Sequence, residues 1–241
     1  MMTIIFNFCS LAAFIFCLSA GFRLRRSYQR IRNEVLKAYS NGFFFVSFAY
    51  LILSLPGLVL FDCFWIQIDF ILVDICFLIA ILFSGPAFFS SFFEKFRHLK
   101  KRIFFLILSY ILIYILLNLI FFSSAIPLTE DNIVYFWKAG TPWLQTIARG
   151  FLVAALLLMA VFFFRWAKES PEKIVSYRSF FIGLGTLIIA AAGFVLWFFP
   201  FFYFSSNLLI FSGLFGFSGF MIGVVNTTVL KFPEEISGSG V

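Results

Sequence analysis

Charged residues are scarce in this sequence. They make up 12% of its 241 residues, against about 25% in a typical soluble domain. Hydrophobic residues reach 63%, well above the roughly 45–50% of soluble proteins. A chain with so little charge and so much apolar surface cannot form an ordinary water-soluble fold, and a soluble domain is therefore excluded.

Histidine and cysteine are also rare. The single histidine, His98, falls in a basic segment, which excludes helix-borne histidine ligands for haem or zinc. The four cysteines, Cys9, Cys17, Cys63 and Cys76, form no C-x-x-C pair, so neither a zinc site nor a redox dithiol is indicated. We therefore expect no metal and no cofactor, and we identify no catalytic residue.

What the sequence does contain is long apolar runs. A membrane-spanning helix needs about 20 mostly apolar residues. Seven runs reach or approach this length: 3–22, 41–61, 66–89, 103–123, 147–164, 180–199 and 204–230. We predict an all-α, polytopic membrane protein, a bundle of seven transmembrane helices in one domain, 1–230, with a short cytoplasmic tail, 231–241. The fifth run is short and begins at Arg149, whose side chain we expect to reach the outer interface.

The basic residues indicate how these helices are oriented, because Lys and Arg concentrate in the cytoplasmic connections of multi-pass proteins. They recur here in every second connection and in the tail: Arg23, Arg25, Arg26, Arg30, Arg32 and Lys37; Lys95, Arg97, Lys100, Lys101 and Arg102; Arg165, Lys168, Lys173 and Arg178; and Lys231. The opposite side has only Lys138 and Arg149. We predict an N-terminus outside and a C-terminus in the cytoplasm, with a prokaryotic plasma membrane as the simplest host.

The basic connections are expected to contact anionic lipid headgroups rather than nucleic acid, because the chain offers no extended soluble surface. The predicted inner-leaflet contacts are Arg23, Arg25, Arg26, Arg30, Arg32, Lys100, Lys101 and Arg102. An apolar stripe at helical spacing predicts an amphipathic helix between the first two runs; it comprises Leu24, Tyr28, Ile31, Val35 and Tyr39. This helix would lie on the inner leaflet or extend a spanning helix. A docking site for a cytoplasmic protein partner is the alternative.

Ionisable residues inside a span are costly and are functional hypotheses by default. Asp74 is the carboxylate that the third run carries at depth, whereas Asp62 and Asp69 flank its outer end and are expected to be wetted. The candidate polar site comprises Asp69, Asp74, Asn118, Asn207 and Asn226. Asp69 does not share a helix face with Asp74. We expect Asp74 to accept hydrogen bonds from an asparagine or backbone group of a neighbouring helix, with an ion or proton pathway as the alternative.

Two further segments have features of their own. The longest external connection is 124–146. Its aromatic residues are expected to form part of an interfacial belt, and a lid over an outward cavity is the alternative. The residues of the possible lid are Glu130, Asp131, Tyr135, Trp137 and Trp143. Small residues that favour close helix packing follow one face of the seventh run: Ser212, Gly216, Gly219 and Gly223. Pro56 and Pro86 are expected to bend the second and third helices.

The leading functional hypothesis is a non-enzymatic seven-helix protein, either a receptor-like sensor of an apolar or membrane-borne ligand or a membrane subunit for a protein partner. A small transporter or channel that uses Asp74 is the second hypothesis. A membrane enzyme acting on lipid, with Asp62, Glu130 and Asp131 as external candidates, is the third and weakest, since these carboxylates have no metal motif or histidine beside them.

Overall fold

The computed structural model describes residues 2–32, 34–56, 59, 62–92, 99–130, 133–138, 140–171 and 173–198. Its helices are α1 (Met2–Ile31), α2 (Glu34–Leu53), α3 (Cys63–Phe92), α4 (Lys100–Ile120), α5 (Pro142–Glu169) and α6 (Lys173–Phe198), and its strands are β1 (Ile126–Glu130) and β2 (Ile133–Lys138). The predicted seventh helix, 204–230, and the tail lie outside the described residues.

Four of these helices are long and apolar enough to cross a membrane. The qualifying segments are Leu36–Leu53, Cys63–Ala87, Lys100–Ile120 and Pro142–Glu169, and Ser179–Ala191 of α6 is a shorter apolar stretch. Large apolar side chains lie on the surface as well, with Leu106 and Leu119 of α4 exposed by 70% and 73%. Extensive apolar exposure of this kind suits contact with lipid. The structure thus supports a mostly helical membrane protein, the coarser part of the sequence-based prediction.

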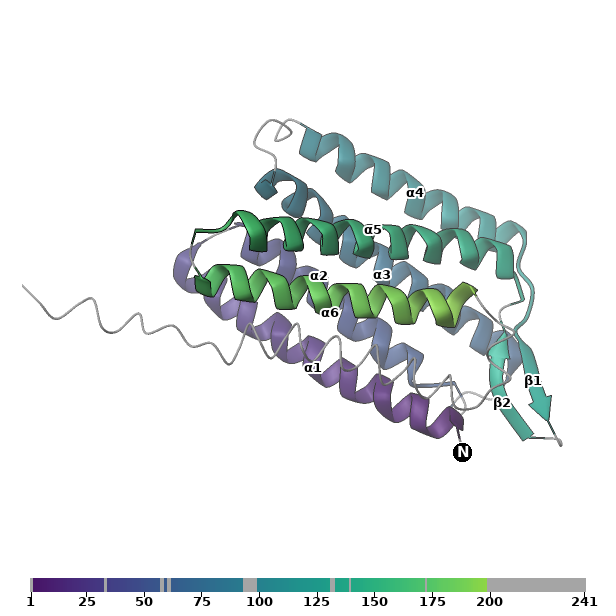
Figure 1. The fold of residues 1–241 in the computed structure, drawn as a ribbon. Coiled ribbons are helices and arrows are strands. Elements are labelled where there is room, and N and C mark those ends of the chain that lie inside the picture. Colours follow the sequence, from purple (N-terminus) through teal and green to yellow (C-terminus); the bar gives the residue numbers. More distant parts are fainter. Residues whose placement is uncertain are drawn as a thin grey trace, which may run out of the picture.

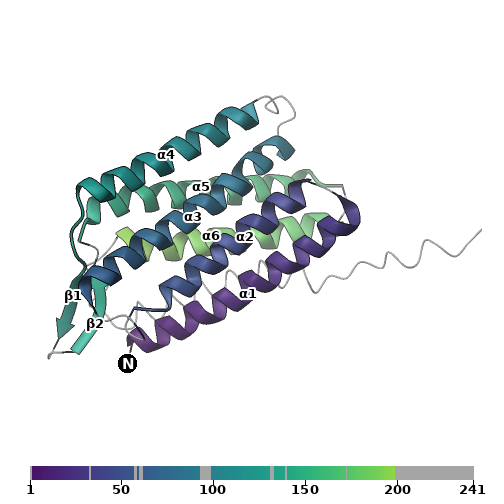
Figure 2. The same ribbon diagram turned by 180° about the vertical axis from the view of Figure 1, so that it is seen from behind.

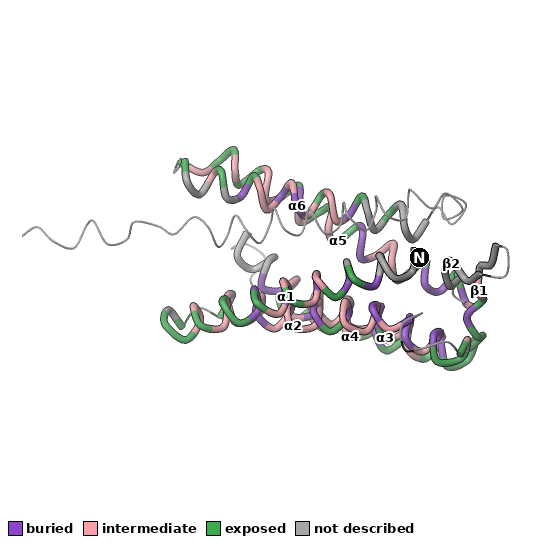
Figure 3. The backbone as a smooth tube through the Cα atoms, turned by 90° about the horizontal axis from the view of Figure 1, so that it is seen from below, coloured by how far each residue is buried: buried purple, intermediate pink, exposed green. Residues whose placement is uncertain are grey.

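The described helices form two layers. Helices α1 to α4 lie side by side in chain order, and α5 and α6 form an antiparallel pair that covers one face of them (Figures 1 and 3). A core of α3, α4 and α5 side chains joins the layers, and its buried members include Leu78, Ile111 and Leu144. Ile189 of α6 packs against a second cluster, built around Cys17 and Ala20 of α1.

Helices α1 and α2 meet in a tight turn instead of continuing as one amphipathic helix. Arg32 takes a left-handed conformation, with φ at 58°, and its N–H donates to the Tyr28 carbonyl over 2.7 Å, which closes the end of α1. The stripe predicted over 24–39 is therefore divided between two helices. The first part belongs to α1, which continues past the predicted boundary at residue 22 to Ile31. Helix α1 is not among the described helices that are apolar enough to cross a membrane, so a membrane span over 3–22 stays a prediction.

The second helix is shifted relative to its predicted span, 41–61. It begins at Glu34 and ends at Leu53, so Pro56 lies beyond the helix and does not bend it. The shift has a local cause, because a proline disfavours helical backbone at the residue before it. The Asn7 side chain donates to the Pro56 carbonyl over 2.7 Å and so attaches this segment to α1. Pro86, in contrast, lies within α3, which continues to Phe92.

The predicted external connection contains a β-hairpin. Strands β1 and β2 pair antiparallel, with Ile126 opposite Lys138 and a register shift between Leu128 and Thr129. The Ala125 N–H donates to the Cys63 carbonyl over 3.0 Å, which holds the hairpin against the start of α3. We call this end of the bundle, where α3 and α5 begin and α4 ends, the hairpin end (Figure 2).

Candidate functional site

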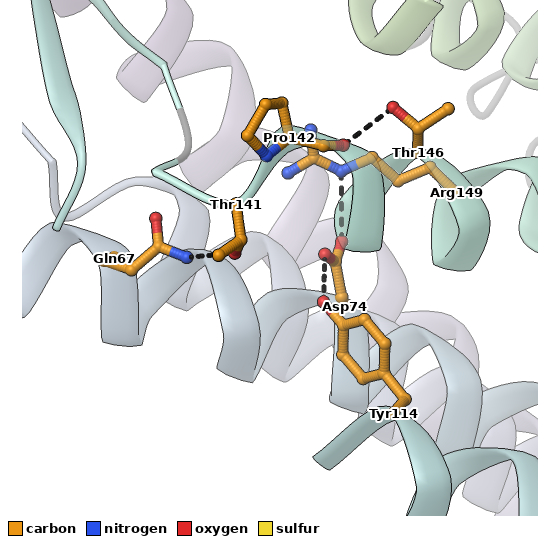
Figure 4. Close-up of polar contacts among 7 residues, drawn as sticks. All are labelled: Gln67, Asp74, Tyr114, Thr141, Pro142, Thr146 and Arg149. Atoms are coloured by element: carbon orange, nitrogen blue, oxygen red, sulfur yellow. Dashed lines mark hydrogen bonds and ion pairs between the residues drawn. The ribbon is translucent and has the colours of Figure 1, made fainter. Parts of the chain in front are cut away.

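Asp74 lies in the interior of the bundle, on α3. Its side chain is 1% exposed, and it is about 16 Å along the helix from Cys63 at 1.5 Å per residue. Both carboxylate oxygens accept bonds from other helices (Figure 4). The Tyr114 hydroxyl of α4 donates to Oδ2 over 2.8 Å, and Arg149 Nε of α5 donates to Oδ1 over 3.2 Å. One carboxylate therefore joins three helices, and we call Asp74, Tyr114 and Arg149 the buried charge cluster.

Arg149 occupies a different place from the one predicted. Helix α5 begins at Pro142 rather than at residue 147, so Arg149 lies two turns inside the helix instead of at its boundary. Its side chain is 17% exposed and forms an ion pair with Asp74. Its Cζ also lies 6.0 Å from the centroid of the Phe70 ring. The opposite charge of Asp74 makes this position acceptable, because a buried charge must be paired.

A second set of polar contacts joins α3 to the start of α5, nearer the hairpin end. Gln67 Nε2 donates to Thr141 Oγ1 over 3.2 Å, and the Gly140 N–H donates to Gln67 Oε1 over 2.9 Å. Glycine is required at residue 140, because a Cβ there would overlap the carbonyl oxygens of Ser123 and Ser124. These contacts fix the height at which α5 begins beside α3.

The other predicted members of the polar site are arranged differently. Asn118 does not bond to Asp74; its amide donates to the Tyr114 carbonyl of its own helix over 2.9 Å. Asp69 is buried, at 3% exposure, rather than wetted, and its Oδ2 has no hydrogen-bond partner in the described part of the chain. Asp69 lies about 140° around α3 from Asp74, at 3.6 residues per turn, so the two carboxylates do not form a pair. Asn207 and Asn226 lie outside the described residues.

The external carboxylates and aromatics are only partly described. Asp62 is exposed, and its Oδ1 accepts the N–H groups of Phe64 and Trp65 over 2.8 and 3.3 Å, so it caps the start of α3. Trp143 belongs to the first turn of α5, where its ring lies 5.6 Å from that of Phe121. The backbone places Glu130 on β1 and Tyr135 and Trp137 on β2, while Asp131 and these three side chains lie outside what the structure describes. The small-residue face of Ser212, Gly216, Gly219 and Gly223 is also outside it.

Most of the described basic residues lie at the end of the bundle opposite the hairpin; Lys138 of β2 and Arg149 of α5 do not. The turn between α1 and α2, the start of α4 and the turn between α5 and α6 all lie there (Figure 1). The predicted lipid contacts at this end are Arg23, Arg25, Arg26, Arg30, Arg32, Lys100, Lys101 and Arg102. Tyr28 organises the first turn: Arg25 Cζ and Lys37 Nζ lie 5.5 and 5.6 Å from its ring centroid, and its hydroxyl donates to Glu34 over 3.3 Å.

Comparisons with models of protein families, with curated proteins and with solved structures find no match for this chain. The geometry of the chain's own residues is therefore the only basis for a functional argument. Sequence reasoning identified Asp74 but missed Tyr114 and Gln67, and it misplaced Arg149. The available signal was the spacing of polar residues, since Gln67 and Asp74 are seven apart on α3 and so lie on one helix face.

Proposed function

We propose that this chain is a non-enzymatic seven-helix integral membrane protein, a receptor-like sensor or the membrane subunit of a complex, whose two helix layers are coupled by the buried charge cluster. Residues 1–230 form a single transmembrane domain in a prokaryotic plasma membrane. The N-terminus lies outside, and the C-terminus lies in the cytoplasm. The clustering of three basic segments at one end of the bundle supports this orientation. Anionic headgroups, and a protein partner that docks at that end, are the expected contacts.

The observation that carries the proposal is the ion pair between Asp74 and Arg149. It lies where α5 of one layer packs on α3 of the other, within two of the apolar segments that, among the described residues, are long enough to cross a membrane. A buried pair is a poor source of net stability compared with apolar packing, but its loss leaves an uncompensated charge in the interior. The pair can therefore favour one arrangement of the layers strongly over others, which is the property a signalling bundle needs.

Transport through Asp74 is supported less well. Both of its oxygens accept bonds from the chain, and the nearest cation is Arg149, which repels a passing cation. Flux of protons or solutes into liposomes that contain the parent protein and the Asp74→Asn variant separates the two functions. We expect no flux in either; flux in the parent that the substitution abolishes would establish transport instead.

The proposed coupling can be measured as a distance between the layers. Spin labels at Lys101→Cys on α4 and Lys168→Cys on α5 occupy exposed sites at the end opposite the hairpin, in a background without the native cysteines. In nanodiscs, we expect Asp74→Asn and Arg149→Met each to broaden or shift the distance distribution. Thr146→Val, an exposed substitution on the same helix as Arg149, is the matched control and should leave it unchanged.

A distribution that is the same in the parent and in both charge variants would overturn the coupling. The orientation is tested separately, with membrane-impermeant thiol reagents in intact cells that carry single cysteines. A cysteine in place of Thr146, near the hairpin end, should react from outside, and one in place of Lys101 should not. The reverse pattern would invert the proposed orientation.

A further inference from the structure

Two buried amide side chains lie one layer above the buried charge cluster, on the side of the hairpin end. Asn118 of α4 is 2% exposed and Gln145 of α5 is 1% exposed. Asn118 Oδ1 and both polar atoms of Gln145, Oε1 and Nε2, have no hydrogen-bond partner among the described residues. Such groups are costly in an apolar interior and are nearly always satisfied by protein, water or a ligand. We call this pair the amide layer.

Helix geometry places each amide about one turn from the buried charge cluster, toward the hairpin end. Asn118 is four residues after Tyr114 on a helix that runs toward the hairpin end, and Gln145 is four residues before Arg149 on a helix that runs away from it. Each is therefore about one turn, roughly 5.4 Å, from a residue that bonds to the same carboxylate, that of Asp74. The contacts of Gln67 with Thr141 and Gly140 lie one further helical turn toward the hairpin end, because Thr141 is four residues before Gln145.

The charges around the amide layer determine whether a ligand bound there can be charged. The ion pair one turn away, Asp74 with Arg149, is neutral as a pair. Asp69 is also buried on α3, but it lies about 140° around that helix from Asp74, on another face, so the layer favours neither a cation nor an anion. The unpartnered atoms are two acceptors, Asn118 Oδ1 and Gln145 Oε1, and one donor, Gln145 Nε2. The donor and the acceptor of the Gln145 amide are two separate atoms, Nε2 and Oε1, and each needs a partner of its own. One water molecule does not satisfy both atoms well. A chemical group that has an acceptor beside a donor can bond to both atoms at once.

We propose that the amide layer is a binding site for a small uncharged molecule with an adjacent hydrogen-bond donor and acceptor, the pattern of a primary carboxamide or urea. The ligand pairs with the Gln145 amide through two hydrogen bonds and donates a further one to Asn118 Oδ1. This site deepens the proposed function, on which its signalling role rests, because a ligand held beside Arg149 and Tyr114 contacts both layers at the point where the buried charge cluster joins them.

Acetamide is the probe, and saturation-transfer NMR on the protein in nanodiscs is the measurement, because so small a ligand binds weakly. We expect saturable binding to the parent, and no competition by N,N-dimethylacetamide, which lacks a donor. Gln145→Met keeps the volume and removes the polar atoms, and should weaken binding by about tenfold or more, the loss expected for about one hydrogen bond. Asn118→Leu is a second, independent variant, and Thr146→Val should bind as the parent does.

Non-saturable binding to the parent, or equal affinity in the parent and in folded Gln145→Met and Asn118→Leu proteins, would overturn the site and leave water as the partner of the two amides. This failure is distinguishable from failure of the proposed function. If acetamide does not bind but Asp74→Asn still alters the distance between the layers, only the ligand site is lost. If acetamide binds saturably but the charge substitutions leave the distance between the layers unchanged, the proposed coupling is wrong and the binding site is supported.

Discussion

The ion pair between Asp74 and Arg149 allows a quantitative test, because the chain contains a second Arg–carboxylate pair in a different environment. Arg165 and Glu169 are one turn apart at the end of α5, with Nε to Oε1 at 2.7 Å and side chains exposed by 66% and 59%. The buried pair is longer, at 3.2 Å, with exposures of 17% and 1%. Distance alone would make the exposed pair the stronger one, whereas burial predicts the opposite.

Double-mutant cycles separate these expectations. Removing one partner of a buried pair leaves an unpaired charge and costs about 3–5 kcal/mol, so Asp74→Asn and Arg149→Met should each lower the free energy of unfolding by about this amount. The double variant should lose about 2–3 kcal/mol less than the sum of the two single losses, and this difference is the coupling energy. For Arg165→Met with Glu169→Gln, water screens the charges, and the coupling should be about 0.3–0.5 kcal/mol.

The assay is SDS-induced unfolding in mixed micelles, followed by helical circular dichroism and by tryptophan fluorescence. Exchanging the charges, with Asp74→Arg and Arg149→Asp in one protein, should recover part of the stability, because a pair is restored in altered geometry. A coupling energy for the buried pair no larger than that of the exposed pair would refute the argument, since Asp74 and Arg149 would then be solvated independently.

Three other substitutions test single contacts with the same unfolding assay. Tyr114→Phe should cost about 1–3 kcal/mol, because it leaves one buried oxygen of Asp74 without its donor; an unchanged stability would mean that water replaces the hydroxyl. Asp62→Ala should cost about 1 kcal/mol through the lost cap of α3, and Asp62→Ser should restore most of it; equal losses in both would argue against capping. Gly140→Ala should destabilise the hairpin end by about 1–3 kcal/mol, since its Cβ would overlap carbonyl oxygens; hydrogen exchange in β1 and β2 that matches the parent would contradict this.

Much of the helical architecture follows from the sequence, because a bilayer imposes a length and a composition on any segment that crosses it. The third and fourth runs, predicted at 66–89 and 103–123, correspond closely to α3 and α4. Boundaries are predicted less well where a local residue outweighs hydropathy. Pro56 ends α2 early, and the turn at Arg32 lets α2 begin at Glu34, well before its apolar run.

The error at Arg149 has a general cause. Hydropathy treats an arginine as the edge of a span, because a lone charge in lipid is expensive. Its partner is 75 residues away in the sequence, and no local pattern reveals that Asp74 cancels its charge. The hairpin was missed for a related reason: β1 and β2 are short strands held against α3 by the contact of Ala125 with Cys63.

By itself, the sequence determined that this protein is helical and apolar enough to span a membrane, which residues are basic and in which connections they lie, and that Asp74 is a costly residue in need of a partner. These properties depend on composition and on spacing along one chain segment. Only the tertiary structure decided that the partners are Arg149 and Tyr114, that Asn118 bonds within its own helix, and that the Gln145 amide has no partner among the described residues. Those outcomes depend on the rotation and height of each helix against its neighbours, which are set by packing across the bundle.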